Sequence, residues 1–319
     1  MNKKLWEASK AIKNKSNLFR YEKFLAKNYN YNISQKYQKL LKWSIDNPNN
    51  FWSSIWDFTK TKGKKNYKFK YSKNLIDSKF LVGSRLNFAE NLLSKNDNTK
   101  AITFISENGY REIRTWNQLN SNTSKIIEFF KINNIKKNDR VAAYLANTVE
   151  TVESFLATAS VGAIWSSCSP DFGINGVIER FSQIKPKLLI ISDRYYYNGK
   201  EINVLKRLPA ILKKIKSIKK VIITNYPGKR SIKFNSFNKI KISYWKNIRK
   251  LKSKKITFNK FDFDHELTIL YSSGTTGKPK CICHRAGGVL MQHLKEHQLH
   301  CEIRPGDNVF YFTTCGWMM

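Results

Sequence analysis

The chain has 319 residues, of which 41% are hydrophobic and 13% aromatic, so it can bury a core of ordinary size and is not expected to be disordered. Its 58 Lys and Arg residues far outnumber its 23 Asp and Glu residues, which gives a formal net charge of +35. This excess is spread along the whole chain without an RNA-binding or zinc-finger signature, so a composition biased towards Lys, Asn and Ile explains it better than a nucleic-acid partner does.

Residues 1–97 are predicted to form a helical cap. This region is basic and rich in aromatic residues, and Pro48 interrupts it. Apolar residues recur at helical spacing in two stretches, residues 37–45 and 51–59, and each stretch predicts a helix. The apolar residues concerned are Leu40, Leu41, Trp43 and Ile45, then Trp52, Ile55 and Trp56. Residues 60–73 are polar and predict an exposed connection.

From residue 98 onwards, short β-rich runs alternate with helical periodicity. Strands are predicted at residues 101–105, 141–145, 163–166, 188–191 and 221–223. Helices are predicted at residues 116–130, 149–159, 174–184 and 204–215. This order predicts an α/β domain over residues 98–319, with layered, mainly parallel sheets and flanking helices. Ligands bind such sheets beyond the carboxyl ends of the strands.

The strongest chemical signal follows a predicted strand at residues 267–271. The sequence there is SSGTTGKPK. Glycines let the backbone approach an anion and present N–H groups, hydroxyls add donors, and lysines add positive charge. The spacing is not that of a Walker A loop, because only two residues separate the glycines. A flexible surface loop is the alternative. We predict a phosphate-binding loop formed by Ser272, Ser273, Gly274, Thr275, Thr276, Gly277 and Lys280.

The string YSSGTTGKPK at residues 271–280 resembles the signature of the adenylate-forming superfamily. In that superfamily the loop wraps the β- and γ-phosphates of ATP while a carboxylate attacks the α-phosphorus. Arg285 departs from the family pattern, in which a small residue usually follows the histidine. Four further segments resemble acetoacetyl-CoA synthetases, so that the similarity spans essentially the whole chain: SRLNFAENLL (84–93), GAIWSSCSPDFG (162–173), HRAGGVLMQHLKEHQLH (284–300) and FYFTTCGWMM (310–319).

The resemblance implies an acid–thiol ligase of lipid and ketone-body metabolism, which joins acetoacetate to CoA with ATP and Mg²⁺ through an acyl-adenylate. It places Gly316 and Trp317 beside the acyl pocket, although a core position suits Trp317 equally well. It also implies that the residues for adenine, ribose and Mg²⁺, and the catalytic lysine, lie beyond Met319. We therefore identify no catalytic residue and expect a fragment that is inactive alone. Two alternatives stay open: a ligase for another short acid such as acetate or propionate, and a non-enzymatic basic protein that binds nucleotide or nucleic acid.

Three other patterns suggest metal or nucleophile chemistry, and we interpret each as structural. HLKEH at residues 293–297 matches a zinc-peptidase pattern, but it falls in the helix that the resemblance predicts after the loop. Cys281 and Cys283 are one residue apart rather than the usual two to four, which favours a strand with alternating side chains. Cys168 is predicted to be a buried small residue. No metal site is predicted.

The cysteines and the hydropathy predict a cytoplasmic protein. There are five cysteines, an odd number without the spacing of a disulfide framework. Residues 1–10 lack the apolar core and cleavage site of a signal peptide. No apolar run reaches the roughly 18 residues of a membrane span. We expect small-molecule partners, namely acetoacetate, ATP and CoA, and neither a membrane nor a nucleic acid; the oligomeric state is not predicted.

Overall fold

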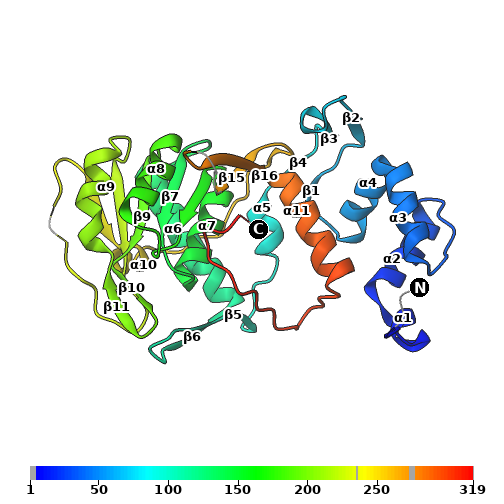
Figure 1. Cartoon of the computed structure of the whole chain (residues 1–319), viewed down its shortest axis with the longest axis horizontal. Helices are drawn as coiled ribbons and strands as arrows, with labels where there is room; N and C mark the ends of the chain where they lie inside the picture. The colour runs from blue at the N-terminus through cyan, green and yellow to red at the C-terminus, as the bar shows by residue number, and fades with distance from the viewer. Residues whose placement is uncertain (1–4, 235, 273–276, 319) are drawn as a thin grey trace. The chain divides into compact units, whose positions relative to one another are not determined.

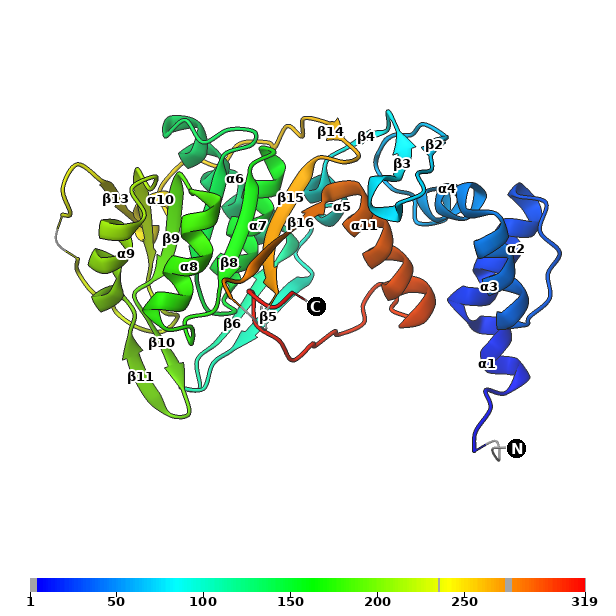
Figure 2. The same ribbon diagram turned by 45° about the horizontal axis from the view of Figure 1, so that its top comes forward.

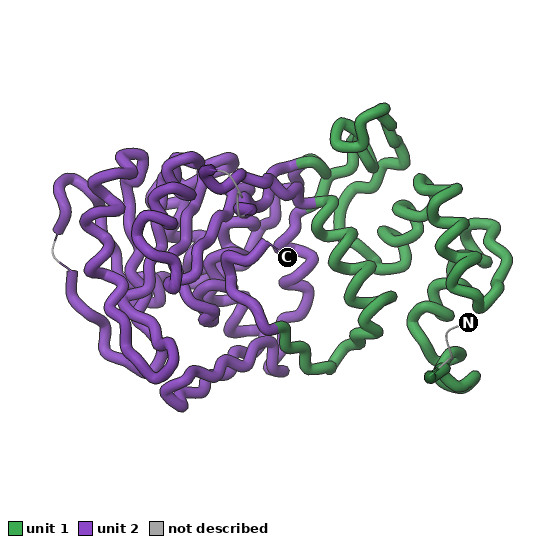
Figure 3. Tube along the Cα trace, in the orientation of Figure 1, with its two compact units in different colours: residues 1–86, 262–264, 287–311 green, residues 87–261, 265–286, 312–319 purple. Residues whose placement is uncertain are grey.

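The computed structural model describes residues 5–234, 236–272 and 277–318 (Figure 1, Figure 2). The chain divides into two compact units, each assembled from several stretches of sequence (Figure 3). The first unit contains residues 1–86, 262–264 and 287–311; the second contains residues 87–261, 265–286 and 312–319. Within the described residues, no helix combines the length and the apolar character needed to cross a lipid bilayer.

The first unit is mainly helical. Its helices are α1 (Lys10–Lys15), α2 (Asn17–Asn28), α3 (Tyr37–Asp46), α4 (Pro48–Phe58), most of α11 (Ala286–Lys295), the 3-10 turn η1 (Leu75–Asp77) and the π-helical turn η3 (Glu296–His300). Its short strands form two antiparallel pairs, β1 (Gly63–Lys64) with β4 (Arg85–Leu86) and β2 (Lys68–Lys70) with β3 (Lys79–Val82). Pro48 is the first residue of α4, where its missing N–H leaves no hydrogen bond unmade.

Helix α2 is fixed by a residue far away in the sequence. The Ser16 hydroxyl caps the helix by accepting the N–H of Phe19 at 3.1 Å. The N–H of Asn17 donates to both carboxylate oxygens of Glu302 at 2.9 Å. A carboxylate is favourable at this position because it satisfies N–H groups that have no partner inside the helix and because it faces the positive end of the helix dipole.

The second unit is built on a seven-stranded sheet with the strand order β13-β12-β9-β7-β8-β15-β16. These strands are β7 (Arg140–Tyr144), β8 (Ile164–Cys168), β9 (Leu188–Ser192), β12 (Lys220–Thr224), β13 (Lys241–Tyr244), β15 (Glu266–Ser272) and β16 (Lys280–Arg285). Neighbouring strands run parallel, except that β15 and β16 are antiparallel. The mainly parallel α/β fold expected from the sequence is therefore confirmed.

Helices cover both faces of this sheet (Figure 2). They are α6 (Trp116–Ile132), α7 (Val149–Ser160), α8 (Ile174–Ile184), η2 (Leu205–Arg207), α9 (Leu208–Lys214) and α10 (Trp245–Arg249), and α5 (Phe88–Leu92) packs on α7. The remaining strands are the hairpins β5 (Lys100–Ile105) with β6 (Arg111–Thr115) and β10 (Arg194–Tyr197) with β11 (Lys200–Asn203), and β14 (Phe261–Asp262). The predicted helix at residues 204–215 is divided at Leu208, next to Pro209, which lies in the first turn of α9.

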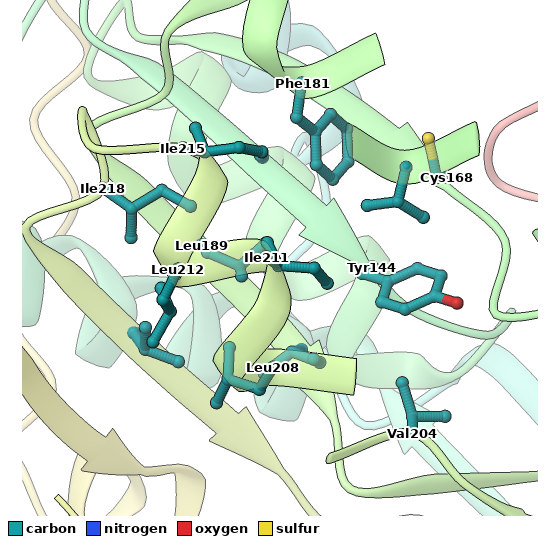
Figure 4. Packing of buried hydrophobic residues seen from close by; sticks show 14 of the residues in the cluster. Tyr144, Cys168, Phe181, Leu189, Val204, Leu208, Ile211, Leu212, Ile215 and Ile218 are labelled. Atoms are coloured by element: carbon teal, nitrogen blue, oxygen red, sulfur yellow. The ribbon is translucent and has the colours of Figure 1, made fainter. Parts of the chain in front are cut away.

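The period of two along each strand sends alternate side chains into two separate cores. Ala142 and Tyr144 pack with Phe181 and Leu208 under α8 and α9 (Figure 4). Val141, one residue earlier, packs on the opposite face with residues of α6, α7 and α10. Strands that are buried on both faces read as continuous apolar sequence, which is why the run Leu188–Ile191 was a clear signal.

The connections reverse direction at β7. Helix α7 leads from β7 to its neighbour β8 along one face, and α8 then leads from β8 back to β9, on the other side of β7. A crevice for ligands opens at such a reversal, outside the carboxyl ends of the strands. Arg285, which departs from the family pattern, ends β16 with an exposed side chain opposite Glu266, so it does not disturb the packing there.

Candidate functional site

The predicted phosphate-binding loop joins the hairpin strands β15 and β16. Ser272 and Lys280 oppose each other in the last pair of the ladder, and β15 is parallel to β8, so the loop starts at the carboxyl edge of the sheet. Gly277 has a φ of +148°, which favours glycine. Lys280 is exposed, whereas Pro279 before it is buried. The predicted loop residues that lie outside the described part of the chain are Ser273, Gly274, Thr275 and Thr276.

Tyr271 anchors the strand that leads into the loop. Its side chain is only 7% exposed, and its hydroxyl donates to the carbonyl oxygen of Arg180 in α8 at 3.2 Å. The hydroxyl of Ser166, in β8, lies 3.1 Å from the Tyr271 oxygen and 2.8 Å from the carbonyl oxygen of Ile269. Burial raises the pKa of Tyr271 above its usual range, so the phenol keeps the proton that it donates.

Gln183, near the end of α8, holds the chain where it leaves the loop. Its Nε2 donates to the carbonyl oxygen of Pro279 at 3.0 Å and to that of Glu179 at 3.0 Å, while its Oε1 accepts from the thiol of Cys281 at 3.6 Å. Both amide hydrogens are therefore used. Together with the contact between Arg180 and Tyr271, this makes α8 the element that fixes both ends of the loop. Sequence reasoning missed Gln183, because the bond joins residues 96 apart in the chain.

The segment that contains the predicted acyl-pocket residues lies against the ends of β7 and β8. The side chain of Asn147 accepts from the N–H of Cys315 at 2.7 Å and donates to the carbonyl oxygen of Thr313 at 2.6 Å. The hydroxyl of Ser167 donates to the carbonyl oxygen of Cys315, and the Cys315 thiol donates to the carbonyl oxygen of Leu145 at 3.0 Å. These contacts place the segment at the same carboxyl edge as the loop.

Gly316 and Trp317 occupy different environments within this segment. A Cβ on Gly316 would lie 2.9 Å from the carbonyl oxygen of Ser167 and 3.1 Å from the Cα of Cys168, so only glycine fits against this backbone. Trp317 is 62% exposed, so it is not a core aromatic. The other interpretation of Trp317, as a wall of an acyl pocket, stays a prediction.

The cysteines interpreted as structural lie in two strands of the central sheet, Cys168 in β8 and the other two in β16. Cys168 is 1% exposed, and burial raises the pKa of its thiol to about 12. Cys281 and Cys283 lie in β16, which confirms the strand; both side chains are exposed, and partial desolvation of the sulfur together with the charge of Glu266 raises the pKa of Cys283 to about 11. The ring of His293 stacks on that of His297 with centroids 6.0 Å apart.

Comparison with known proteins assigns the family. Residues 89–319 match the profile of the AMP-binding enzyme family. The chain belongs to the AMP-binding enzymes. Within this family, the AMP-binding chain is 42% identical to the acetoacetyl-coenzyme A synthetase of Rhizobium meliloti (strain 1021), over 87% of the chain and 42% of that protein. It is 35% identical to the malonamoyl-CoA synthetase of Penicillium aethiopicum, over 92% of the chain and 42% of that protein.

The fold of this AMP-binding chain also matches a solved structure. The acetoacetyl-CoA synthetase from Streptomyces lividans superimposes with a TM-score of 0.91 at 28% identity, over 99% of the chain and 48% of that structure. The chain thus spans less than half the length of each relative named here.

Proposed function

We propose that this AMP-binding chain supplies the ATP-phosphate-binding part of a ligase that converts acetoacetate, CoA and ATP into acetoacetyl-CoA, AMP and pyrophosphate. The observation that supports this most is the Gly- and hydroxyl-rich connection between β15 and β16 at the carboxyl edge of the sheet. A loop of this composition presents backbone N–H groups to an anion, and its lysines add positive charge where phosphate oxygens collect.

The chemistry proceeds in two balanced steps. A carboxylate oxygen of acetoacetate attacks the α-phosphorus of Mg²⁺-ATP, and the bond from that phosphorus to the bridging oxygen breaks to release pyrophosphate. The sulfur of CoA, having lost its proton, then attacks the acyl carbon, and the carbon–oxygen bond to AMP breaks. In this scheme the residues from Ser272 to Lys280 hold the β- and γ-phosphates, so that the leaving pyrophosphate is already in contact with positive charge.

The acid is inferred from what two relatives share. Acetoacetate and malonamate both carry a carbonyl group β to the carboxylate, and they differ only in a methyl or an amino group beyond it. One relative is a synthetase of acetoacetyl-CoA and the other of malonamoyl-CoA. We therefore propose that the enzyme selects a short β-carbonyl acid and that acetoacetate is its substrate.

Pyrophosphate exchange into ATP tests both parts of the proposal. The measurement uses the gene product that carries this chain, with acetoacetate, malonamate, acetate and propionate as acids. We expect acetoacetate to support exchange at least about ten-fold better than acetate, which corresponds to about 1.4 kcal/mol of discrimination. Exchange with acetate but not with acetoacetate would contradict the substrate, and exchange with none of the acids would contradict the ligase.

A further inference from the structure

A cavity lies at the opposite edge of the same sheet from the loop. It has a volume of about 400 Å³, within the size range of small-molecule sites. Its walls come from α6, from residues 135–137 before β7, from residues 160–161 before β8, and from the extended segment 255–261. We call it the lysine cavity. Its lysines have no part in the predicted phosphate loop.

Four lysines surround the lysine cavity: Lys131, Lys136, Lys137 and Lys255. The carboxylate that lines it, Glu128, is already bonded to Lys131 at 2.7 Å and to Lys254 at 2.6 Å. Lys136, Lys137 and Lys255 make no ion pair with the described residues. Three ammonium groups at the rim are thus available to an anion.

The floor of the lysine cavity is apolar. Ile127, Ile135 and Phe261 are 6%, 4% and 8% exposed and line it. The ammonium nitrogen of Lys137 lies 5.7 Å from the centre of the Phe261 ring, which keeps positive charge directly beside the aromatic wall. A charged rim over an apolar floor suits a ligand that has an anionic end and a flat or hydrophobic body.

Helix ends provide a competing explanation for the lysines. Helices α6 and α7 both end beside the lysine cavity, and each carboxyl end carries roughly half a negative charge, which lysines neutralise. The two helix ends and Glu128 together amount to about two negative charges, against four lysines. The cavity therefore keeps a positive excess of about two charges after its helices are neutralised.

We propose that the lysine cavity binds a small organic anion with about two negative charges and a flat ring, the chemistry of a nucleoside monophosphate. This site is separate from the phosphate loop and does not depend on the proposed ligase activity. The charged group would contact Lys136, Lys137 and Lys255, and the ring would lie against the apolar floor.

Acetylation of lysines by a water-soluble reagent, followed residue by residue with mass spectrometry, tests the proposal. The probes are AMP, adenosine and inorganic pyrophosphate. At an AMP concentration about ten times Kd, we expect the acetylation of Lys136, Lys137 and Lys255 to slow about ten-fold. Adenosine should give no protection and pyrophosphate less than AMP. Lys213 and Lys214 on α9 are exposed and should react equally with and without AMP.

A charge-reversed variant separates the two explanations. In Lys136→Glu/Lys137→Glu, AMP should no longer protect Lys255, while any effect of AMP on Lys280 should stay unchanged. If this variant does not fold, Lys136→Gln/Lys137→Gln replaces it with the same expectation. Equal acetylation of the three cavity lysines with and without AMP overturns the proposal and leaves neutralisation of the helix ends as their role. Protection of Lys255 that persists in the variants overturns it as well.

Discussion

Lys280 is the described residue that tests the phosphate loop most directly. It is exposed at the rim of the sheet, opposite Ser272, where its charge can reach a phosphate. Replacing it in Lys280→Met keeps the aliphatic stem and removes the charge. A charge-assisted hydrogen bond contributes about 1.5–3 kcal/mol, so we expect ATP to bind roughly 10- to 100-fold more weakly, as measured by titration calorimetry.

The matched control for this change is Lys213→Met, on α9, where the lysine is also exposed. This variant lowers the net positive charge of the protein by the same amount as Lys280→Met does. It therefore shows how much of the ATP affinity comes from general electrostatic attraction to the whole protein. We expect its ATP affinity to stay within a factor of about two of that of the original protein. Equal losses in both variants would mean that ATP is attracted by the charge of the whole surface and that the loop is not its site.

Gly316 tests how tightly the segment after Thr313 is packed. In Gly316→Ala the new methyl group would meet backbone atoms of Ser167 and Cys168, which cannot rotate away. Such overpacking costs about 1–3 kcal/mol, so we expect a lower midpoint of urea unfolding. Gly288→Ala is the control, because a Cβ there meets nothing within 4 Å and alanine is the better helix residue. If both variants unfold at the same midpoint, the segment does not pack on the end of β8.

At the scale of elements, α8 is predicted to position the loop through Gln183. Gln183→Leu keeps the size of the side chain and removes its bond to the carbonyl oxygen of Pro279. We expect faster tryptic cleavage after Lys280 and a weaker affinity for ATP, by about 0.5–1.5 kcal/mol, with little change in the unfolding midpoint. Ser182→Ala, at the neighbouring exposed position, should change none of these quantities. Cleavage at the original rate would show that this bond does not hold the loop.

A buried group of charges joins β6, α6, α7 and α10. Glu153 in α7 is 0% exposed, and its Oε1 accepts from Nε of Arg114 at 3.0 Å and from Nδ2 of Asn122 at 2.7 Å. Arg249 donates to Glu150 at 3.1 Å. Burial, assisted by the charge of Glu150, raises the pKa of Glu153 to about 7.

This raised pKa predicts how stability changes with pH. The pKa of Glu153 is 4.5 in the unfolded chain and about 7 in the folded chain. Between these two pH values the folded chain binds the proton of Glu153 more tightly than the unfolded chain does. The stabilisation that this proton gives the folded state is therefore present below this range and is lost as the pH rises through it. Glu153→Gln cannot lose a proton. From pH 5 to pH 8, the free energy of unfolding should therefore fall less in this variant, with a difference on the order of 3 kcal/mol.

Glu128→Gln is the control for this measurement. Hydrogen bonds from Lys131 and Lys254 lower the pKa of Glu128. The ionised carboxylate therefore stabilises the folded state, and this stabilisation is lost only as the pH falls below the pKa that Glu128 has in the unfolded chain. In Glu128→Gln, the free energy of unfolding should change between pH 5 and pH 8 by the same amount as in the original protein. Urea unfolding at several pH values measures all three proteins, and identical pH slopes for the original protein and Glu153→Gln would contradict the raised pKa.

The elements that sequence reasoning predicted well are those whose signal is local. The expected helix at residues 174–184 coincides with α8, and the expected strand at 188–191 is one residue shorter than β9. Helical periodicity and a continuous apolar run both arise from burial against one or two neighbouring layers. Helix α2 was not predicted, because its start depends partly on Glu302, which no short window of sequence contains.

The sequence predicts a phosphate-binding chemistry for the loop, which stays a prediction, but it does not predict the residues that support the loop. The composition of the loop indicates phosphate because glycine, hydroxyl and lysine act through their own atoms. Its anchors, Tyr271 with Ser166 and Pro279 with Gln183, are ordinary polar residues that gain a role only when the sheet brings them together. Hydrogen bonds between residues about 100 positions apart leave no pattern in a single sequence.

At the scale of the whole molecule, the net charge of +35 predicts binding to any polyanion without sequence preference. The excess lysines are distributed over both units, so each contact is weak and exposed, and salt should remove most of the binding. In a filter-binding assay, we expect the affinity for a single-stranded RNA to fall at least about a hundred-fold between 50 and 200 mM salt, and heparin to compete as well as unlabelled RNA does. ATP binding at the loop should change much less over this range, because it depends on backbone N–H groups as well as on charge. RNA binding that stays tighter than about 1 µM at 200 mM salt and resists heparin would instead support the alternative in which the charge itself is the function.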